Sequence, residues 1–383
     1  MKIWLIQAVI APYRVRLFEK ISRSDGVDFS LILLSTKFKH RPNWKSDHKK
    51  MPFRVQPVMG MTFKVSHELQ LSLNPFILFK MIRHRPDVII CGGYNLSTLM
   101  ALVYKKLFGG RYLVWTESIA VTEKHISGLK RRLRKLIIEN ACCFVDAGEL
   151  SRRYVESFLP QGHDKRFFRS YNCIDVTRFR DQSSFKDPFA GRDVPAKNIL
   201  FVGVLNERKG VLELMEAYRE VAEKAFGAGL VMVGEGPLKG QLGTYCREHG
   251  LDKVSFEGWV KYEDVAGYYR GCDVFVLLSR KDPNPLVIFE ALAAGIPIIC
   301  SSNAGNAVEF VQDGVNGYVV DPDDTGAVSA KLLDVLSWDD ERIENARGFS
   351  ERVLAKADYD SSAKAFVDAC RFCLGQNVKE ETL

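Results

Sequence analysis

Short apolar runs of strand length alternate with segments of helical apolar spacing along this chain. The runs form two series, separated by Asp181–Pro195, a polar stretch that carries Gly191 and two prolines. Strands that alternate with helices are typical of parallel sheets, because a parallel connection needs a crossover. We therefore predict an α/β protein with two doubly wound domains in tandem and a cleft between them. The predicted strands are Ile3–Gln7, Phe29–Leu34, Val88–Cys91, Tyr112–Thr116, Cys142–Ala147 and Phe168–Tyr171, then Asn198–Val204, Leu230–Val233, Val254–Phe256, Val274–Leu278, Pro297–Ser301 and Tyr318–Val320.

The polar stretch sets the expected domain boundary. Residues 1–187 form the first predicted domain and residues 188–357 the second, and 383 residues suffice for two domains of ordinary size. The last segment, 358–375, has helical apolar spacing, and we expect it to pack back on the first domain.

Composition narrows the class of protein. The chain is 46% hydrophobic and 26% charged, which indicates a globular protein, and no run approaches 18 apolar residues. The start, Met1–Ala8, predicts a first strand rather than a signal peptide. Nine cysteines are scattered, and the lone C-x-x-C of Cys370 and Cys373 favours helix packing over a zinc or redox site. We expect a cytoplasmic protein that binds no metal.

Charge is divided unevenly. Residues 1–187 contain 33 Lys and Arg against 16 Asp and Glu, a net charge of +17, whereas the remainder contains 21 against 31, a net charge of −10. The basic half is expected to attract phosphates or an anionic membrane face. Nucleic acid is not an expected partner, because no aromatic–basic recognition motif or zinc pattern is present.

One predicted helix, Gly128–Ile138, concentrates this positive charge. Its apolar residues Leu129, Leu133, Leu136 and Ile137 share one face, and five cations line the other, Lys130, Arg131, Arg132, Arg134 and Lys135. Such a helix can lie on the inner face of the cell membrane as a peripheral contact, or can simply pack on its own sheet. Membrane contact is favoured by a second basic loop in the same domain, formed by Lys37, Lys39, His40, Arg41, Lys45, Lys49 and Lys50.

The segment after the strand Val274–Leu278 predicts an anion site. Asn284 has the character of an N-cap and Pro285 that of a first helical residue. The next three amides, from Leu286, Val287 and Ile288, would then face the crevice at the end of the strand.

Two carboxylates, Asp282 and Glu290, flank this helix start. Side chains lean toward the N-terminus of a helix, so Glu290 would reach back to the same crevice. An anion site between carboxylates suits a phosphate ester that carries hydroxyl groups, such as a nucleotide sugar. The alternative is an ordinary buried helix start with a solvated Glu.

Two glycine-containing turns precede this helix start in the second domain. Gly203 ends the first strand and is followed by Arg208, Lys209 and Gly210, where the cations could neutralise a diphosphate or could merely be solvated. Gly234-Glu235-Gly236, with Glu257 some twenty residues on, imitates a dinucleotide fingerprint. The third glycine that the fingerprint requires is one residue out of place. The motif also follows the second strand of its domain rather than the first, so nicotinamide binding is disfavoured. The Asp321-Pro322-Asp323-Asp324 turn is expected to be structural.

Taken together, these segments resemble the retaining nucleotide-sugar glycosyltransferases of family 4, which have the GT-B fold of two Rossmann-like domains. The resemblance is strongest from Asn198 to Asp324. It rests on the glycine turns above and on Phe256–Val260, Asp273–Val276, Glu290–Pro297, Glu309 and Asp313–Gly317. In the first half, Ala11–Phe18 and Asn172–Phe179 are weaker matches.

The resemblance implies roles for these residues. The donor diphosphate would be held by Lys209 and Arg208, and the ribose by Glu290. The sugar would meet Asp282, and the base would meet Phe256–Val260. The implied donor site also includes Gly203, Gly234, Gly258, Leu286 and Val287, and the opening loop supplies Tyr13 and Arg14 for the acceptor. No cofactor or metal is implied beyond the nucleotide diphosphate-sugar as co-substrate.

Three positions depart from that family's pattern. Asp282 stands where the family usually has Glu, and Val204 stands where a basic residue is frequent. Glu117 stands at the place of an active-site histidine, so it could position the acceptor or stabilise the positively charged sugar centre. Its alternative role is to cap a strand end.

The predicted reaction is transfer of a hexose-type sugar from a nucleotide diphosphate-sugar, with retention. The expected acceptor is a lipid-linked or surface-polysaccharide or lipopolysaccharide intermediate. The alternatives are a nucleotide-sugar epimerase of the same fold and a catalytically silent nucleotide-sugar-binding protein.

Overall fold

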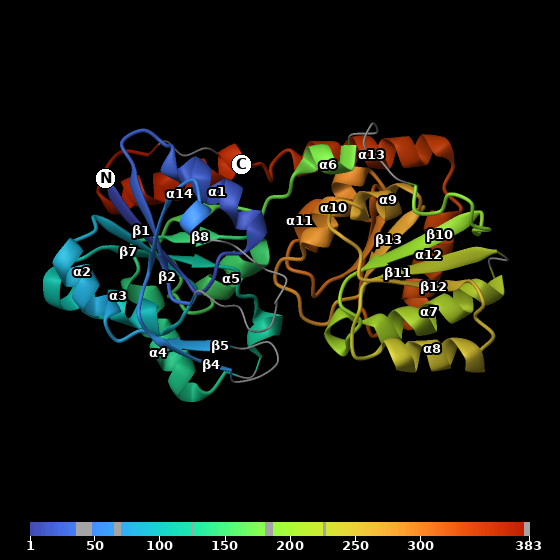
Figure 1. Ribbon diagram of the computed structural model, residues 1–383, viewed down its shortest axis with the longest axis horizontal. Helices are drawn as coiled ribbons and strands as arrows, with labels where there is room; N and C mark the ends of the chain where they lie inside the picture. Colours follow the sequence, from blue (N-terminus) through green and yellow to red (C-terminus); the bar gives the residue numbers. More distant parts are fainter. Residues whose placement is uncertain (36–47, 65–69, 125, 181–186, 225–226, 379–383) are drawn as a thin grey trace. The chain divides into compact units, whose positions relative to one another are not determined.

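A computed structural model describes residues 1–35, 48–64, 70–124, 126–180, 187–224 and 227–378. The chain divides into two compact units. Unit 1 comprises Met1–Cys173 together with the chain from Ala357 onward, and unit 2 comprises Ile174–Lys356 (Figure 1). Each unit has its own parallel sheet.

The sheet of unit 1 has the strand order β3-β2-β1-β6-β7-β8-β9, and all its neighbours are parallel. The strands are β1 (Lys2–Gln7), β2 (Asp28–Leu33), β3 (Arg54–Pro57), β6 (Val88–Gly92), β7 (Tyr112–Thr116), β8 (Phe144–Asp146) and β9 (Phe167–Arg169). An antiparallel pair, β4 (Met61–Lys64) and β5 (Gln70–Leu73), stands apart from this sheet.

Helices cover both faces of this sheet. One face packs on α2 (Ile77–His84), α3 (Leu96–Phe108), α4 (Gly128–Asn140) and α5 (Glu149–Glu156), and the other on α1 (Val15–Ser22) and α14 (Tyr359–Cys373). Short 3-10 turns are η1 (Pro12–Arg14), η2 (His48–Lys50) and η3 (Ala120–Glu123). Helix α3 shows how the sequence sets its limits: the Asn95 side chain accepts the amides of Ser97 and Thr98, and Gly109 ends the helix in a left-handed conformation.

The last helix, α14, returns to unit 1 and lies beside α1 in Figure 1. Phe366 is fully buried, and its ring meets that of Trp115 edge-on with centroids 5.0 Å apart. Cys370 and Cys373 belong to the same apolar cluster. The C-terminal helix is therefore part of the core of unit 1.

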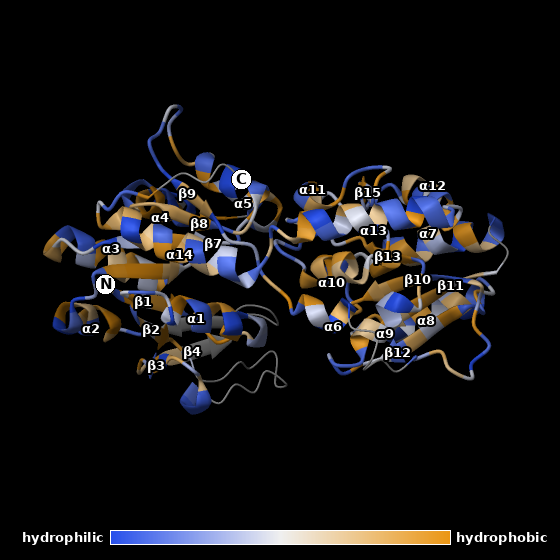
Figure 2. Ribbon diagram, turned by 90° about the horizontal axis from the view of Figure 1, so that it is seen from above, coloured by the Kyte–Doolittle hydropathy of each residue, from blue (hydrophilic) through white to orange (hydrophobic). Residues whose placement is uncertain are grey.

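The sheet of unit 2 has the order β12-β11-β10-β13-β14-β15, also with parallel neighbours. Its strands are β10 (Lys197–Val202), β11 (Ala228–Val233), β12 (Val254–Gly258), β13 (Val274–Leu277), β14 (Ile298–Ser301) and β15 (Gly317–Val320). Its helices are α6 (Val176–Arg180), η4 (Glu207–Lys209), α7 (Val211–Lys224), α8 (Lys239–Glu248), α9 (Val265–Arg270), α10 (Leu286–Ala294), α11 (Ala307–Phe310), α12 (Thr325–Leu336) and α13 (Asp340–Leu354). Figure 2 shows the hydrophobic colour concentrated in the strands and in α10, whose residues from Ile288 to Ala293 are buried.

The predicted α/β class with two parallel, doubly wound sheets is confirmed, and each of the twelve predicted strands overlaps an observed one. The strands β3, β4 and β5 were not predicted. Strand β3 is a four-residue edge strand with no fully buried side chain, so its sequence lacks an apolar run. In the described part of the chain, every helix is too short or too polar to cross a membrane.

Candidate functional site

The topology of unit 2 predicts where a ligand would bind. From β10 the chain runs outward to β11 and β12, and it then returns to place β13 on the other side of β10. In open α/β sheets, ligands bind at such a switch point, outside the carboxyl ends of the strands. The turn after β10 and the loop between β13 and α10 both leave from this point.

Lys209 and Asp282 meet there. The Nζ of Lys209 lies 2.5 Å from Oδ2 of Asp282, and each residue is only 8% exposed. Arg208 adds a second cation, with Nη1 3.5 Å from the same Oδ2 and 3.0 Å from the carbonyl oxygen of Lys281. The side chain of Asn206 accepts the Lys209 amide and so fixes the η4 turn that carries both cations. Two cations thus converge on one carboxylate.

Gly210 allows this convergence. Its φ is +68°, and a Cβ at this position would lie 1.9 Å from the carbonyl oxygen of Leu278. Only glycine therefore permits the turn after β10 to approach the end of β13 this closely.

Glu290 lies in the second turn of α10, within electrostatic range of Lys209. It is 6% exposed, and its carboxylate accepts a hydrogen bond of 2.8 Å from the Tyr269 hydroxyl. Burial raises the pKa of Glu290 to about 7, although the Tyr269 hydrogen bond and the charge of Lys209 both act to lower it. The Lys209 ammonium group is therefore within electrostatic reach of two carboxylates, those of Asp282 and Glu290.

The start of α10 differs from the prediction. The helix begins at Leu286 with Pro285 in the N-cap position, and Asn284 does not cap it. Instead, Asn306 donates from Nδ2 to Oδ1 of Asn284 and to the Pro285 carbonyl oxygen. The amides of Leu286 and Val287 still have no acceptor within the helix, as the first amides of any helix must.

The predicted glycine turns lie side by side at the carboxyl ends of β10, β11 and β12. The Gly203 amide donates to the Val233 carbonyl oxygen at 2.9 Å, and the Gly234 amide donates to that of Gly258 at 2.8 Å. A Cβ on Gly234 would lie 1.9 Å from the Gly203 carbonyl oxygen. Trp259, which follows Gly258, is 64% exposed and presents an aromatic face to solvent.

Other carboxylates of unit 2 have structural partners. Asp323 binds Arg280, and Asp324 caps α12 by accepting the Ala327 amide. Glu257 accepts two hydrogen bonds from Arg192, at 3.0 and 2.8 Å, and these lower its pKa. Among the described residues, no group of three His, Cys, Asp or Glu side chains is placed to hold a metal ion.

In unit 1, Glu117 follows β7 and is held by two side chains. The Nη2 of Arg14 lies 2.7 Å from Oε2 of Glu117, and Asn172 donates to Oε1 at 2.7 Å. The guanidinium also lies 4.3 Å from the Trp115 ring centroid and 3.4 Å from Oε1 of Gln7. Burial would lower the pKa of Arg14, but Glu117 and Tyr13 outweigh it, so the pKa is raised.

This unit 1 cluster brings together the predicted residues Tyr13, Arg14 and Glu117. Gln7 and Asn172 also belong to this cluster and were not predicted as site residues, and neither was Tyr269 in unit 2. Gln7 ends β1 and Asn172 follows β9, so a polar residue at a strand end was the available signal. Tyr269 lies inside an apolar helix and gave no such signal.

The basic helix α4 differs from its prediction at Arg134. Lys130, Arg131, Arg132 and Lys135 are exposed, but Arg134 is 4% exposed. Its guanidinium lies 3.1 Å from Glu123 and hydrogen bonds to the Tyr154 hydroxyl. The predicted basic loop is not open to the same test, because Lys37, Lys39, His40, Arg41 and Lys45 lie outside the described residues.

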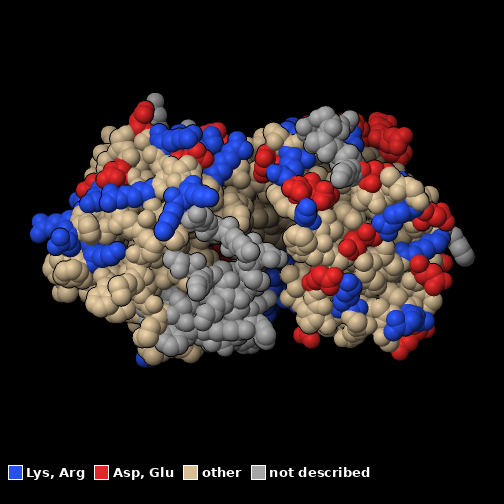
Figure 3. All heavy atoms as spheres, in the orientation of Figure 1, with Lys and Arg blue, Asp and Glu red and all other residues tan. Residues whose placement is uncertain are grey.

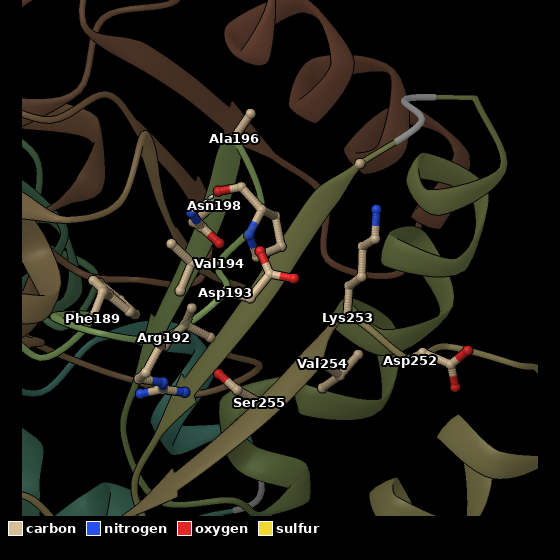
Figure 4. A pocket seen from close by; sticks show the side chains of 13 residues that line it. Phe189, Arg192, Asp193, Val194, Ala196, Asn198, Asp252, Lys253, Val254 and Ser255 are labelled. Carbon is tan, nitrogen blue, oxygen red and sulfur yellow. Dashed lines mark hydrogen bonds between the residues drawn. The ribbon is translucent and has the colours of Figure 1, made fainter.

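A pocket of about 450 Å³ occupies the opposite end of the unit 2 strands (Figure 4). Asn198 and Ser255 lie near the starts of β10 and β12, and Arg192 and Lys253 line the same space. None of the predicted site residues lines it.

Comparison with known proteins relates unit 2 to one family. Residues 184–351 match the family described as Glycosyl transferases group 1. An uncharacterised glycosyltransferase of Methanocaldococcus jannaschii is 33% identical over 196 residues, which are 50% of this chain and 48% of that protein. The amylovoran biosynthesis glycosyltransferase AmsD of Erwinia amylovora is 26% identical over 297 residues, which are 74% and 78% of the two chains. The chain otherwise spans about half the length of the curated relatives it matches.

The fold extends over both units. The structure of Anabaena HepE in complex with UDP has a TM-score of 0.76 with this chain, at 16% identity, covering 96% of this chain and 99% of that one. The architecture is therefore that of the GT-B proteins, with two Rossmann-like domains of parallel sheet.

Proposed function

We propose that this chain is a glycosyltransferase that binds a nucleotide diphosphate-sugar in unit 2. The observation that carries the proposal is the meeting of Lys209, Arg208, Asp282 and Glu290 at the switch point of the sheet, beside the first amides of α10. Cations and helix amides suit a diphosphate, and a buried carboxylate suits ribose hydroxyls. The match to Glycosyl transferases group 1 covers these residues.

We further propose the retaining chemistry of family 4 with a hexose-type sugar. Lys209, Arg208 and the α10 amides would stabilise the leaving diphosphate without a metal ion. Asp282 would bind hydroxyls of the transferred sugar, and the leaving phosphate would accept the proton of the attacking hydroxyl on the same face. In unit 1, Glu117, fixed by Arg14 and Asn172, would orient the acceptor.

The proposed acceptor is a lipid-linked or surface-polysaccharide or lipopolysaccharide intermediate at the inner face of the membrane. The name of AmsD places that relative in the biosynthesis of a polysaccharide, amylovoran. The excess of Lys and Arg in the first half of the chain also favours binding of that half to an anionic membrane surface.

Nucleotide binding is the first test. Nucleoside diphosphates and their sugars should raise the melting temperature, since a ligand of the native state stabilises it. Lys209→Ala and Glu290→Ala should lose this shift, whereas Lys253→Ala, in the pocket of Figure 4, should keep it. The opposite pattern would place the ligand in that pocket and refute the site.

Turnover separates the alternatives. Transfer to an acceptor with the anomeric configuration kept, and with activity unchanged by a chelator, is the expected result. Epimerised or hydrolysed donor without any acceptor would identify an epimerase or a hydrolase. Donor binding without turnover on lipid-linked or polysaccharide acceptors would identify a silent binding protein.

A further inference from the structure

Large hydrophobic side chains that remain exposed in unit 1 gather on one side of its sheet. Among the described residues these are Met59, Met61, Phe76, Phe79, Leu107, Phe108, Leu129, Leu133 and Leu136. They come from the β3–β4 segment and from α2, α3 and α4, with α3 packed against both of its neighbours. The helices of the opposite face, α1 and α14, expose none in the part that the structure describes. Exposed apolar side chains that recur on neighbouring helices of one face are a feature of interaction surfaces.

Helix α4 gives this face its sharpest pattern. Leu129, Leu133 and Leu136 are 70%, 39% and 43% exposed, and their spacing places them on one side of the helix. Ile137 and Ile138 face the core instead, so the leucines are not needed to hold the helix on the sheet. The structure thus separates two apolar faces that the sequence pattern had merged.

Positive charge surrounds the leucines. Lys130 and Arg132 are exposed and flank them at helical spacing, and Lys135 is exposed one turn further on. Glu139 is the one acidic residue within α4. Over α2, the face drawn in Figure 3 likewise shows Lys and Arg side chains beside uncharged ones. Apolar side chains with a cationic border match the acyl and phosphate layers of an anionic bilayer.

A second copy of this chain suits the surface less well. Two such faces brought together would oppose like charges, which weakens association. A bilayer supplies both an apolar layer and anionic headgroups for the exposed cations, of which Lys135 also lies 3.7 Å from Glu139 within the helix.

We propose that α2, α3 and α4 form a membrane-docking face, in which Leu129, Leu133 and Leu136 insert among the lipids of an anionic membrane and the neighbouring cations bind headgroup phosphates. Arg134 takes no part, because it is buried against Glu123 and Tyr154. The proposal deepens the proposed function, since it names the surface at which a lipid-linked acceptor would be met, but docking itself requires neither donor nor acceptor.

Co-sedimentation of the full chain with vesicles tests the proposal. Vesicles of phosphatidylcholine with phosphatidylglycerol should bind at least about tenfold more tightly than phosphatidylcholine alone, and less tightly at high salt. The variant Leu129→Gln/Leu133→Gln/Leu136→Gln should bind at least about tenfold more weakly. The single variant Leu129→Gln should show part of the same loss. Equal binding by the leucine variants and the unmodified chain would overturn the proposal.

Charge has its own matched control. The variant Lys130→Gln/Arg132→Gln/Lys135→Gln should lose most of the preference for anionic vesicles. The control removes three exposed cations of unit 2, as Lys224→Gln/Arg247→Gln/Lys253→Gln, and should bind as the unmodified chain does. An equal loss in the control would show a response to net charge alone, and the docking face would be refuted.

Two further measurements separate other outcomes. If the leucine variant changed a dimer into a monomer without changing vesicle binding, the face would be a self-association surface and the proposal would fail. Nucleotide-induced thermal shifts of the same preparations report on unit 2 independently. Loss of vesicle binding with intact nucleotide shifts supports docking, and nucleotide shifts absent from every preparation would refute the donor site without touching the docking face.

Discussion

Glu290 makes the stability of the ligand-free protein depend on pH in a predictable direction. Its pKa of about 7 lies above the ordinary value of 4.5, because the carboxylate is buried. The native state therefore keeps the proton over a range in which the unfolded chain has lost it. The stability that Glu290 contributes is complete below pH 4.5, falls as the pH rises, and is lost above about pH 7.

The magnitude follows from the two pKa values. Each pKa unit corresponds to about 1.4 kcal/mol, so Glu290 should cost the native state roughly 2 to 3 kcal/mol between pH 5 and pH 8. Glu290→Gln resembles the protonated acid and should not titrate. The free energy of unfolding of the unmodified chain should thus fall relative to that of Glu290→Gln by this amount.

Urea unfolding at intervals from pH 5 to pH 8 measures the difference. Glu257→Gln is the matched control, because the pKa of Glu257 is lowered by Arg192 and its stabilising contribution disappears only as the solution becomes acidic. Its difference from the unmodified chain should be flat over the same range. A flat difference for Glu290→Gln as well would refute the argument, and would show that the Glu290 carboxylate is solvated in the native protein.

Three further predictions concern other contacts. Asp282→Asn frees Lys209 from its ion pair, so a nucleoside diphosphate without sugar should bind a few-fold more tightly in calorimetry, while sugar transfer falls by at least about tenfold. Arg14→Lys keeps the charge but loses the planar fork that holds Glu117, so the transfer rate should fall about tenfold with nucleotide binding in unit 2 unchanged. Phe366→Ala should lower the free energy of unfolding by about 3 to 5 kcal/mol in urea, because the ring is fully buried. The matched controls are Asp252→Asn, Arg16→Lys and Phe372→Ala in that order, and each should have a much smaller effect. The first argument fails if Asp282→Asn weakens diphosphate binding, and the second fails if Arg14→Lys transfers sugar at the normal rate. The third fails if Phe366→Ala and Phe372→Ala lose equal stability.

The central strands of both sheets were predictable because each is a buried apolar run that alternates with helical segments along the sequence. The edge strand β3 was not, because none of its four side chains is fully buried and its sequence has no such run. The C-terminal helix was predictable as a helix from its spacing. Its return to the first domain was also expected, but its contact with the Trp115 ring depends on tertiary packing, which spacing alone does not specify.

The donor-site residues could be proposed from sequence because they follow strands that meet at one switch point. The ion pair between two of these residues could not be predicted from sequence. Lys209 and Asp282 are 73 residues apart, and their contact depends on how closely the turn at Gly210 approaches the end of β13. Asn284 is a position at which the sequence prediction was wrong. An Asn before a helix predicts an N-cap, but here the Oδ1 of Asn284 accepts a hydrogen bond from the buried Asn306 instead of from a helix amide.

Arg134 shows why a helical wheel cannot decide a surface by itself. The wheel groups Arg134 with four other cations, and only the tertiary structure shows that Glu123 and Tyr154 enclose it. A buried cation needs such partners, because desolvation of an unpaired charge is costly. With Arg134 and Ile137 turned inward, α4 must rotate its leucines outward, and the same rotation brings Lys130 and Arg132 to their sides. The burial of Arg134 with its partners, together with that of Ile137 and Ile138, therefore fixes the orientation of the helix that exposes the row of leucines on which the proposed docking depends.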